Sequence, residues 1–368
     1  MKTIVFHPEV FVFSDEESFL LYNTHKGNSR EIARCDFWDK LFLTINSINS
    51  LYRYAIPEKD WGEYYPTITE ICQEGYAAVY EQEEPIPFSY APIPKLDVDL
   101  PAIKLRHKNG EGGFILSFVR TIGFYLDGKM DLERVRPFLS ALDYCYVTRV
   151  EVFLEDPLLG DYYSPLFHHF ESEYNNCHIQ LKASSWDTDS LLFFAQSHPK
   201  WQLHLRGTVE ELSPFFGTVP LRVFVRNEAE QALADHLHPE EIIPKYDGQN
   251  IDYLRSTLFT IKEDLTGSSK RDIFIRQTLN SNYFGRLLVF SNGEVRAGRY
   301  GALLGTTETP LYEMVYKELI SEESLWMLHR DKTDCKDCRF RYLCPCVSDF
   351  ELSLGNYRLC WRNGFFLN

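Results

Sequence analysis

Five of the nine cysteines lie near the end of the chain, and their spacing is typical of metal ligation. They form Cys335-x2-Cys338-x5-Cys344-x1-Cys346, and Cys360 follows after a longer gap. Two cysteines two residues apart can place both thiolates on one ion, and two further thiolates complete a tetrahedral site. We expect Cys335, Cys338, Cys344 and Cys360 to be the ligands, with Cys346 as a spare. Four thiolates can hold zinc or an iron–sulfur cluster, and the spacing leaves both open.

Two other groups of residues could do chemistry but lack a supporting pattern. Histidines occur in pairs at 168–169 and 236–238, and His204 lies two residues before Arg206. We interpret them as ordinary core or surface residues. Acidic residues gather at 151–161, near the end of a predicted strand, where α/β barrels place active sites. A solvated acidic loop is the simpler interpretation.

Composition and charge exclude several classes of protein. The 368 residues include 38 Lys and Arg against 53 Asp and Glu, a net charge of −15, which argues against binding along a phosphate backbone. His7, Pro8 and Glu9 interrupt the first apolar residues, so no signal peptide is predicted. No apolar run approaches the roughly 18 to 20 residues that span a bilayer. We therefore expect a cytoplasmic protein with neither a nucleic-acid nor a membrane partner.

The first part of the chain predicts strands followed by helices. Strand patterns run over 10–13, 19–22 and 29–32. Helical spacing follows in 37–48, with Asp36 as the expected N-cap, and in 68–80. This order is typical of a winged-helix-like module, and the proline-rich segment 84–101 would link it to the rest of the chain.

The middle of the chain alternates strand and helix patterns. The predicted strands are 121–126, 147–154, 178–183, 201–205 and 221–225, with helices such as 132–142 and 228–238 between them. Right-handed βαβ units produce such intervals, so we expect a parallel sheet curved into a full or partial barrel. The fold class is therefore α/β.

A hairpin is predicted after the barrel. Strand patterns at 287–290 and 294–296 flank Asn292 and Gly293, the pair preferred in type I′ turns. We expect three domains: a winged-helix-like peptide-recognition module with its linker over 1–95, a βα barrel over 96–283, and a Cys-rich metal subdomain over 284–368.

The tail resembles the SPASM region that follows the catalytic barrel of many radical SAM peptide-modifying enzymes. The resemblance rests on the cysteine spacing and on the preceding NGEV hairpin. A complete SPASM region has another cysteine just after the hairpin glycine, where this chain has Arg296, Ala297 and Gly298. The resemblance therefore implies one metal site in place of the usual two clusters. The stretches VFVF, LLYNT, YLCPCVSDFE and GNYRLC look closest to degenerate, pseudo-radical-SAM proteins of Bacteroidales ribosomal-peptide maturation systems.

The barrel departs from the radical SAM pattern in two places. Such enzymes carry three cysteines after their first strand, because three thiolates leave one iron open to chelate the cofactor, but the loop 127–130 has none. At the end of the second strand they carry Gly-Gly-Glu-Pro, where this chain has Leu154, Glu155 and Asp156 before Pro157. Leu154 and Glu155 stand where the glycines belong, and their side chains would obstruct the cofactor. The resemblance thus implies a degenerate motif, no bound SAM and no radical SAM catalysis.

The N-terminal module is similar in element order to domains that bind precursor leader peptides by adding a strand. That mode uses main-chain hydrogen bonds along an edge and apolar pockets for alternate side chains. We place the groove between the third strand and the second helix. Its expected residues are Asn28, Arg30, Ile32, Ile68 and Tyr76.

The resemblance implies a non-catalytic partner in ribosomal-peptide maturation. It would bind the precursor peptide, the active radical SAM maturase or both, with its four-Cys metal site stabilising the tail. Two alternatives stay open. One is an enzyme that uses an iron–sulfur cluster for electron transfer or the barrel mouth for hydrolysis. The other is a nucleic-acid-binding regulator, which requires a basic face that the composition does not provide.

Overall fold

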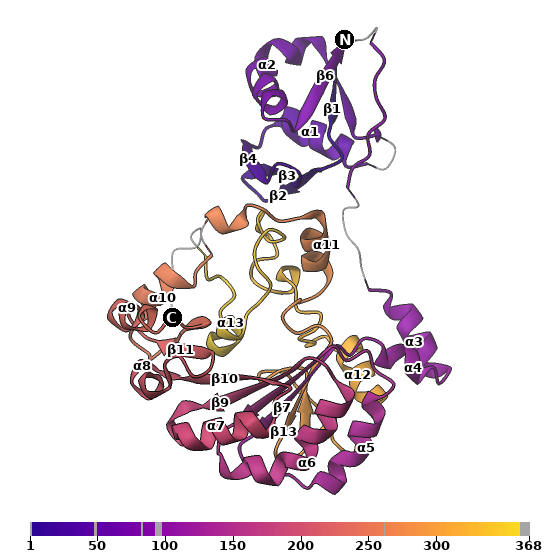
Figure 1. The fold of residues 1–368 in the computed structure, drawn as a ribbon. Helices are drawn as coiled ribbons and strands as arrows, with labels where there is room; N and C mark the ends of the chain where they lie inside the picture. Colours follow the sequence, from indigo (N-terminus) through magenta and orange to yellow (C-terminus); the bar gives the residue numbers. More distant parts are fainter. Residues whose placement is uncertain (1, 48–49, 82–83, 93–97, 261, 361–368) are drawn as a thin grey trace.

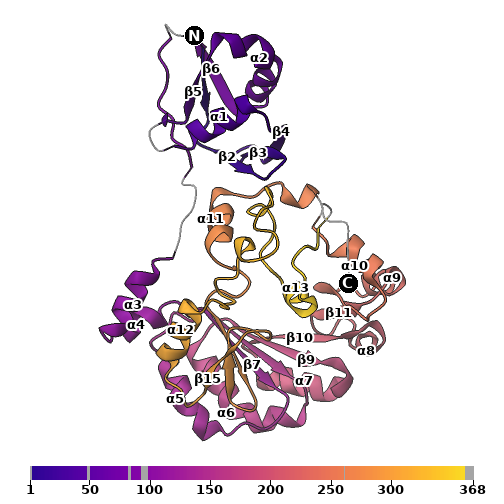
Figure 2. The same ribbon diagram turned by 180° about the vertical axis from the view of Figure 1, so that it is seen from behind.

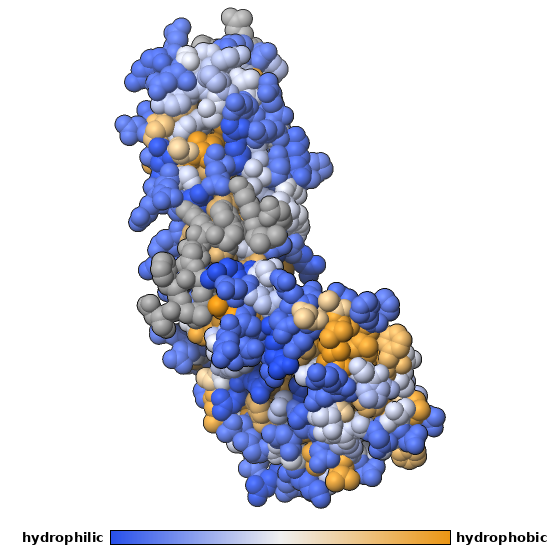
Figure 3. Space-filling model, turned by 90° about the vertical axis from the view of Figure 1, so that its left-hand side faces the viewer, coloured by the Kyte–Doolittle hydropathy of each residue, from blue (hydrophilic) through white to orange (hydrophobic). Residues whose placement is uncertain are grey.

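The computed structural model describes residues 2–47, 50–81, 84–92, 98–260 and 262–360. An N-terminal module and a large α/β sheet lie at opposite ends, and the C-terminal tail occupies the space between them (Figures 1 and 2). No helix of the described residues is long and apolar enough to cross a membrane. On the face that Figure 3 shows, hydrophilic side chains cover most of the surface and the apolar patches are separate.

The N-terminal module contains two three-stranded antiparallel sheets and two helices. One sheet has the order β2-β3-β4 and contains the three predicted strands. The other, of order β5-β1-β6, was not predicted. The elements are β1 (Lys2–Phe6), β2 (Val10–Ser14), β3 (Ser18–Asn23), β4 (Asn28–Ala33), α1 (Asp36–Ile45), β5 (Arg53–Ile56), α2 (Glu58–Gln73) and β6 (Ala77–Glu81). A winged-helix relationship stays an expectation.

Two details of the predicted helices are wrong. The second helix was expected over 68–80, but α2 begins at Glu58 and ends at Gln73. Gly75 then turns the chain with a φ of +83°, a conformation that favours glycine, and β6 follows. The N-cap of α1 is Cys35, with extended backbone angles, and Asp36 is already the first helical residue. Asp36 therefore lies in the first turn, where its charge complements the helix dipole.

The α/β part is built on a nine-stranded, mainly parallel sheet of order β12-β11-β10-β9-β8-β7-β13-β14-β15. This confirms the α/β class, and the end strands β12 and β15 leave the sheet open. Its strands are β7 (Thr121–Leu126), β8 (Arg149–Leu154), β9 (Cys177–Lys182), β10 (Trp201–Thr208), β11 (Leu221–Val225), β12 (Glu241–Pro244), β13 (Arg286–Phe290), β14 (Glu294–Arg296) and β15 (Leu303–Thr306). The five predicted strands correspond to β7 through β11.

Helices cover one face of this sheet (Figure 1). Along β8, Val150, Val152 and Leu154 are fully buried on that face. The helices of this part and of the tail, of which α5, α6 and α7 lie against that face, are α3 (Leu100–Lys108), α4 (Gly112–Leu116), α5 (Leu132–Leu142), α6 (Leu158–Glu173), α7 (Thr188–Ser197), α8 (Val209–Leu212), α9 (Glu228–Asp235), α10 (Ile251–Thr257), α11 (Lys270–Thr278), α12 (Leu311–Ile320) and α13 (Asp349–Leu354). The opposite face carries the alternate, largely polar residues of the strands, because successive side chains of a strand point to opposite faces.

The predicted hairpin forms, but its turn is not type I′. Phe290 accepts a hydrogen bond from the amide of Gly293 (2.8 Å), and Gly293 has a φ of +84° whereas Asn292 is not left-handed. This is the three-residue loop in which a left-handed glycine follows a type I turn. The strand β13 pairs with β7 in parallel, so the sheet continues across the expected domain boundary at 283/284.

The tail and the N-terminal module share a hydrophobic cluster. Phe11, Phe13 and Tyr22 of the module pack with Phe340 and Tyr342 of the tail. The ring centroids of Phe13 and Tyr342 lie 5.5 Å apart in an edge-on arrangement. The sheet β2-β3-β4 therefore has the tail against one of its faces.

Replacing Gly285 by alanine should lower the free energy of unfolding by about 2 to 4 kcal/mol. Gly285 precedes β13 with a φ of +77°, and a Cβ atom there would meet the carbonyl oxygen of Phe118 at 2.5 Å. Gly248→Ala is the control, because its φ is +93° but nothing lies within 4 Å; it should cost about 1 kcal/mol. Urea unfolding measures both, and equal losses would show that the contact with Phe118 is unimportant.

Candidate functional site

Four of the five tail cysteines lie near enough to one another for the charge of one thiol to act on the pKa of another. Cys335 and Cys338 flank a tight turn in which the amide of Cys338 donates to the carbonyl of Cys335 (2.9 Å). Cys344 follows a second turn and donates its amide to the carbonyl of Phe340 (3.0 Å). Cys360 lies at the end of the described tail and forms an isolated β-bridge with Thr260. All nine cysteines of the chain are thiols.

Two of these cysteines have raised pKa values, and each is affected by the charges of the other thiol groups. The pKa of the Cys344 thiol is raised to about 12, mainly by burial; the charge of Arg330 lowers it, and the thiol groups of Cys338, Cys360 and Cys335 raise it. The pKa of Cys335 is also raised, mainly by burial. Without metal both thiols stay protonated at neutral pH, so metal binding must displace their protons.

Cys346 has a different environment. Its sulfur accepts hydrogen bonds from the amide (3.4 Å) and the hydroxyl (3.3 Å) of Ser281 and lies 3.9 Å from the carbonyl oxygen of Leu279. The residue is buried. These contacts assign Cys346 to the packing of the tail against the segment after α11, and its role as a spare ligand stays a prediction.

The donor set of the four thiols suits zinc or an iron–sulfur cluster, as the sequence predicts. Within the described part of the chain, however, they do not bring three sulfur atoms within 4.8 Å of one another. A single zinc ion, with Zn–S distances of about 2.3 Å, would therefore draw the thiols inward. The ligand set remains a prediction.

A buried arginine connects the segments that carry these cysteines. The guanidinium of Arg330 donates to both carboxylate oxygens of Glu351 (2.6 and 3.2 Å), to the carbonyl of Pro345 (2.9 and 3.1 Å) and to that of Tyr357 (2.9 Å). Burial by itself would lower the pKa of Arg330, but Glu351 outweighs it and the net shift is upward. The charge is therefore kept, and it lies next to Cys335 and Cys344, where it favours thiolates.

An acidic pocket of about 260 Å³ opens beside two of the cysteines. It lies between the turn that joins β2 to β3 and the tail, and five of its residues are acidic. The lining residues are Asp15, Glu16, Glu17, Asp334, Cys335, Asp337, Cys338 and Arg358. The surface next to Cys335 and Cys338 thus favours cationic groups.

At the carboxyl end of the parallel sheet, Glu155 is held in a network of side chains. It accepts a hydrogen bond from the hydroxyl of Tyr125 at the end of β7 (2.8 Å) and pairs with Arg206 of β10. Leu154 is fully buried on the helix-covered face, and Asp156 accepts a hydrogen bond from the amide of Leu158 (2.9 Å). Of the three residues of the degenerate motif, only Glu155 is part of this network.

The loop after β7 is tied down by tyrosines of α6. Tyr163 donates its hydroxyl to the carbonyl of Gly128 (2.6 Å) and accepts from the amide of Met130 (2.8 Å), and Tyr162 donates to the carbonyl of Met130 (2.7 Å). Met130 is buried. The loop is therefore anchored to α6 by its backbone and by Met130, although Asp127 and Lys129 are exposed, and it contains no cysteine.

A polar network on the face of the sheet opposite α5, α6 and α7 was not predicted. Glu151 pairs with Arg149 (2.7 Å) and with Arg286 (3.0 Å), and the rings of His178 and His204 are 5.5 Å apart. Burial lowers the pKa of both histidines. The alternation of these residues with apolar ones along each strand was the signal that could have revealed them.

The expected peptide-binding residues gather between β4 and α2, but they are not equally accessible. Ile32, Ile68 and Tyr76 are buried, at 5%, 0% and 0% exposure. Arg30 pairs with Glu70 of α2 and with Glu74, the C-cap residue of that helix. The side-chain amide of Asn28 lies 3.4 Å from the carbonyl oxygen of Glu74. Surface contact would come from Asn28 and Arg30, above an apolar base of the other three.

Comparisons with known proteins give little support for an identity. No family model matches the chain, and no curated protein matches it significantly. The crystal structure of Streptococcus suis SuiB bound to S-adenosylmethionine aligns with 95% of this chain and 96% of its own, at 12% identity and a TM-score of 0.39. A heterocyclase in complex with substrate and cofactor aligns with 48% of this chain and 22% of its own, at 16% identity and a TM-score of 0.17. These scores are too low to carry an argument about family or activity.

Serine substitutions should separate the ligands from the spare cysteine. Cys344→Ser should abolish stoichiometric metal binding and make the tail sensitive to protease, because a hydroxyl cannot replace a thiolate ligand. Cys346→Ser should keep the metal. Elemental analysis for iron, sulfide and zinc after anaerobic purification measures the outcome. Metal retained in Cys344→Ser, or lost in Cys346→Ser, would contradict the assignment.

Arg330→Lys should destabilise the tail by about 2 to 3 kcal/mol, because an ammonium cannot make the forked bonds of a guanidinium. Arg358→Lys is the control, since Arg358 bonds the carbonyl of Asp334 at an exposed position. Limited proteolysis of the tail and thermal melting give the readout. If the two substitutions destabilise the tail equally, the buried hydrogen bonds of Arg330 stabilise it no more than those of an exposed arginine.

Proposed function

We propose that the protein is a non-catalytic partner in ribosomal-peptide maturation that binds an extended precursor peptide along β4, and that also binds the active radical SAM maturase. The observation that carries the proposal is a set of unsatisfied polar groups beside an open strand edge. The side-chain oxygen of Asn28 and the Nε of Arg30 are buried without a hydrogen-bond partner among the described residues. Buried polar groups are rarely left unpaired, so these groups suit a ligand.

The edge of β4 supports strand addition. Among the described strands, β4 pairs with β3 alone. The amide of Arg34 bonds the carbonyl of Glu17 (3.1 Å), and the alternation of an antiparallel ladder then directs the main-chain groups of Ser29, Glu31 and Ala33 away from β3. All three residues are exposed. The amides and carbonyls of Ser29 and Ala33 are available to a peptide in the extended mode of recognition.

The module's contact with the tail connects this edge to the proposed metal site. Arg339 pairs with Asp15 and with Glu31 of β4 itself. A structural metal at the four cysteines would keep Arg339 in place, because Cys338 precedes it directly. The metal then acts on peptide binding through the position of β4, and no electron transfer is required.

The barrel supports a non-catalytic role. The loop after β7 has no cysteine and is fixed by Tyr162 and Tyr163. Glu155, paired with Arg206, occupies the place of a glycine in the cofactor-binding motif of radical SAM enzymes. Binding and presentation of a peptide need neither feature.

Ser29→Pro tests strand addition. Proline removes the outward amide of Ser29 and leaves the ladder to β3 intact, as edge strands tolerate proline. A labelled synthetic precursor peptide of the maturation system should bind the variant at least about tenfold more weakly by fluorescence anisotropy, which is about 1.4 kcal/mol. Ser29→Ala is the matched control and should bind like the unchanged protein.

Equal affinity of the proline and alanine variants would show that the peptide does not add to β4. If the unchanged protein binds neither the peptide nor the maturase in a pull-down, the binding function itself is wrong.

A further inference from the structure

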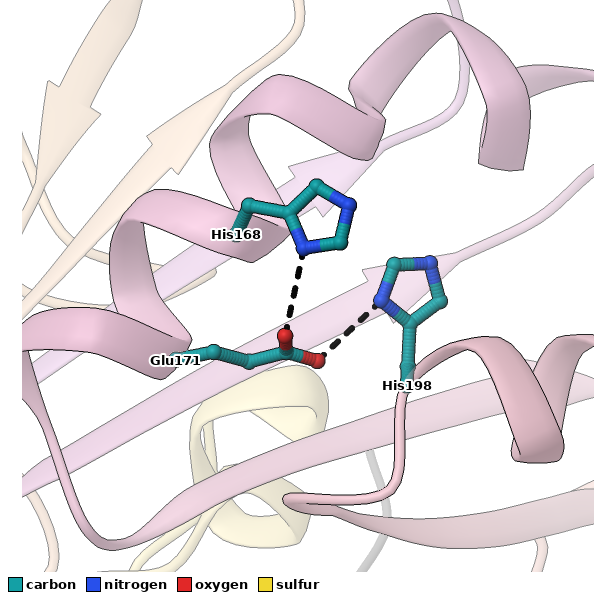
Figure 4. A group of neighbouring side chains, drawn as sticks. All are labelled: His168, Glu171 and His198. Atoms are coloured by element: carbon teal, nitrogen blue, oxygen red, sulfur yellow. Dashed lines mark hydrogen bonds and ion pairs between the residues drawn. The ribbon is translucent and has the colours of Figure 1, made fainter.

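A second candidate site lies on the helix-covered side of the sheet, away from the cysteines and β4. His168 and Glu171 are on one face of α6, three residues apart, and His198 follows α7 directly. Figure 4 shows both imidazole rings directed at the one carboxylate. Among the described residues, this is the group of His, Cys, Asp and Glu side chains whose ligating atoms all lie within 4.8 Å of one another. The sequence singled out His168 but gave no partner for it. In the folded chain Glu171 and His198 lie beside it.

We propose that His168, Glu171 and His198 bind a divalent transition-metal ion such as Zn²⁺. Two imidazoles and one carboxylate are a donor set that suits this class of ion. The Nδ1 atom of His168 lies 3.3 Å from one oxygen of Glu171, and the Nδ1 atom of His198 lies 3.1 Å from the other. Donors about 2.0 to 2.2 Å from one tetrahedral ion are about 3.3 Å apart. Both nitrogen–oxygen distances are close to this value, and all three ligating atoms lie within 4.8 Å of one another.

The surroundings hold the donors in position. His198 is 4% exposed, and its ring packs against Phe167 (5.3 Å between centroids) and Phe194 (4.7 Å). Gly160 allows this approach, because a Cβ atom there would lie 3.3 Å from the ring of Phe194. Lys200, the neighbouring cation, bonds the main-chain carbonyl of Glu171 (2.9 Å) and leaves its carboxylate to the histidines.

The site borders a cavity of about 680 Å³. His168 and His198 are part of its lining, together with aromatic residues such as Trp186 and Phe193 and the acidic residues Asp161 and Asp189. Three protein ligands leave a fourth position of a tetrahedral ion open, as in catalytic zinc sites. That position would face the cavity, where water or a small anionic ligand can occupy it, and the two acidic residues favour entry of a cation.

The test is Zn²⁺ binding to the full chain by equilibrium dialysis at neutral pH, followed by elemental analysis. The unchanged protein should bind one zinc more than His168→Gln and one more than Glu171→Gln. Affinity at this site should fall by more than about 100-fold, since loss of an outer-shell partner alone costs 10- to 100-fold. The side chain of His168 is 62% exposed, so its replacement leaves the core intact. His169→Gln is the matched control, one position away on α6, and should keep the extra zinc.

Cobalt distinguishes this ion from one in the tail. The Co²⁺ that is lost in His168→Gln should show no thiolate charge-transfer absorption, because its ligands are nitrogen and oxygen. Equal zinc stoichiometry in the unchanged protein and His168→Gln overturns the proposal, as does loss of the ion in His169→Gln alone. The result is independent of peptide binding at β4, which the proline variant measures separately.

Discussion

The buried guanidinium of Arg330 is the interaction on which the tail depends. The tail from 330 to 360 has few regular elements, so its segments are not joined by a strand ladder or a long helix. Arg330 joins three of them through Glu351, Pro345 and Tyr357. Buried charges are costly unless they are paired and hydrogen-bonded, and both conditions are met here. The segments that carry Cys335, Cys344 and Cys360 thereby come together before any metal is considered.

The tail in turn determines the position of the N-terminal module. Phe340 and Tyr342 pack under β2 and β3, and Arg339 pairs with acidic residues of the same sheet. An apolar cluster supplies most of the association energy and the ion pairs fix its orientation. The β4 edge and the cysteines are consequently parts of one assembly. Because the tail and the module are in contact, a structural metal in the tail can affect peptide binding at β4.

The two faces of the large sheet have separate chemistry. On the helix-covered face, His168, Glu171 and His198 form a polar group at α6 and α7, and they lie beside a cavity. On the other face, charged residues from neighbouring strands pair with one another, as Glu151 does with Arg149 and Arg286. The carboxyl end belongs to the second network through Glu155 and Arg206. The proposed metal sites and the peptide edge therefore occupy three different parts of the molecule.

The sequence by itself determined the features that depend on local periodicity and spacing. The strands β7 through β11, the helix α5 and the knuckle of Cys335 and Cys338 could be predicted, because each is encoded by residues that are neighbours along the chain. The sheet β5-β1-β6 was missed, since its strands are short and lie far apart in the sequence. Only the tertiary structure decided that Arg330 meets Glu351, that β13 joins β7, and that His198 meets Glu171. These contacts depend on how distant segments pack, and a local pattern carries no information about that packing.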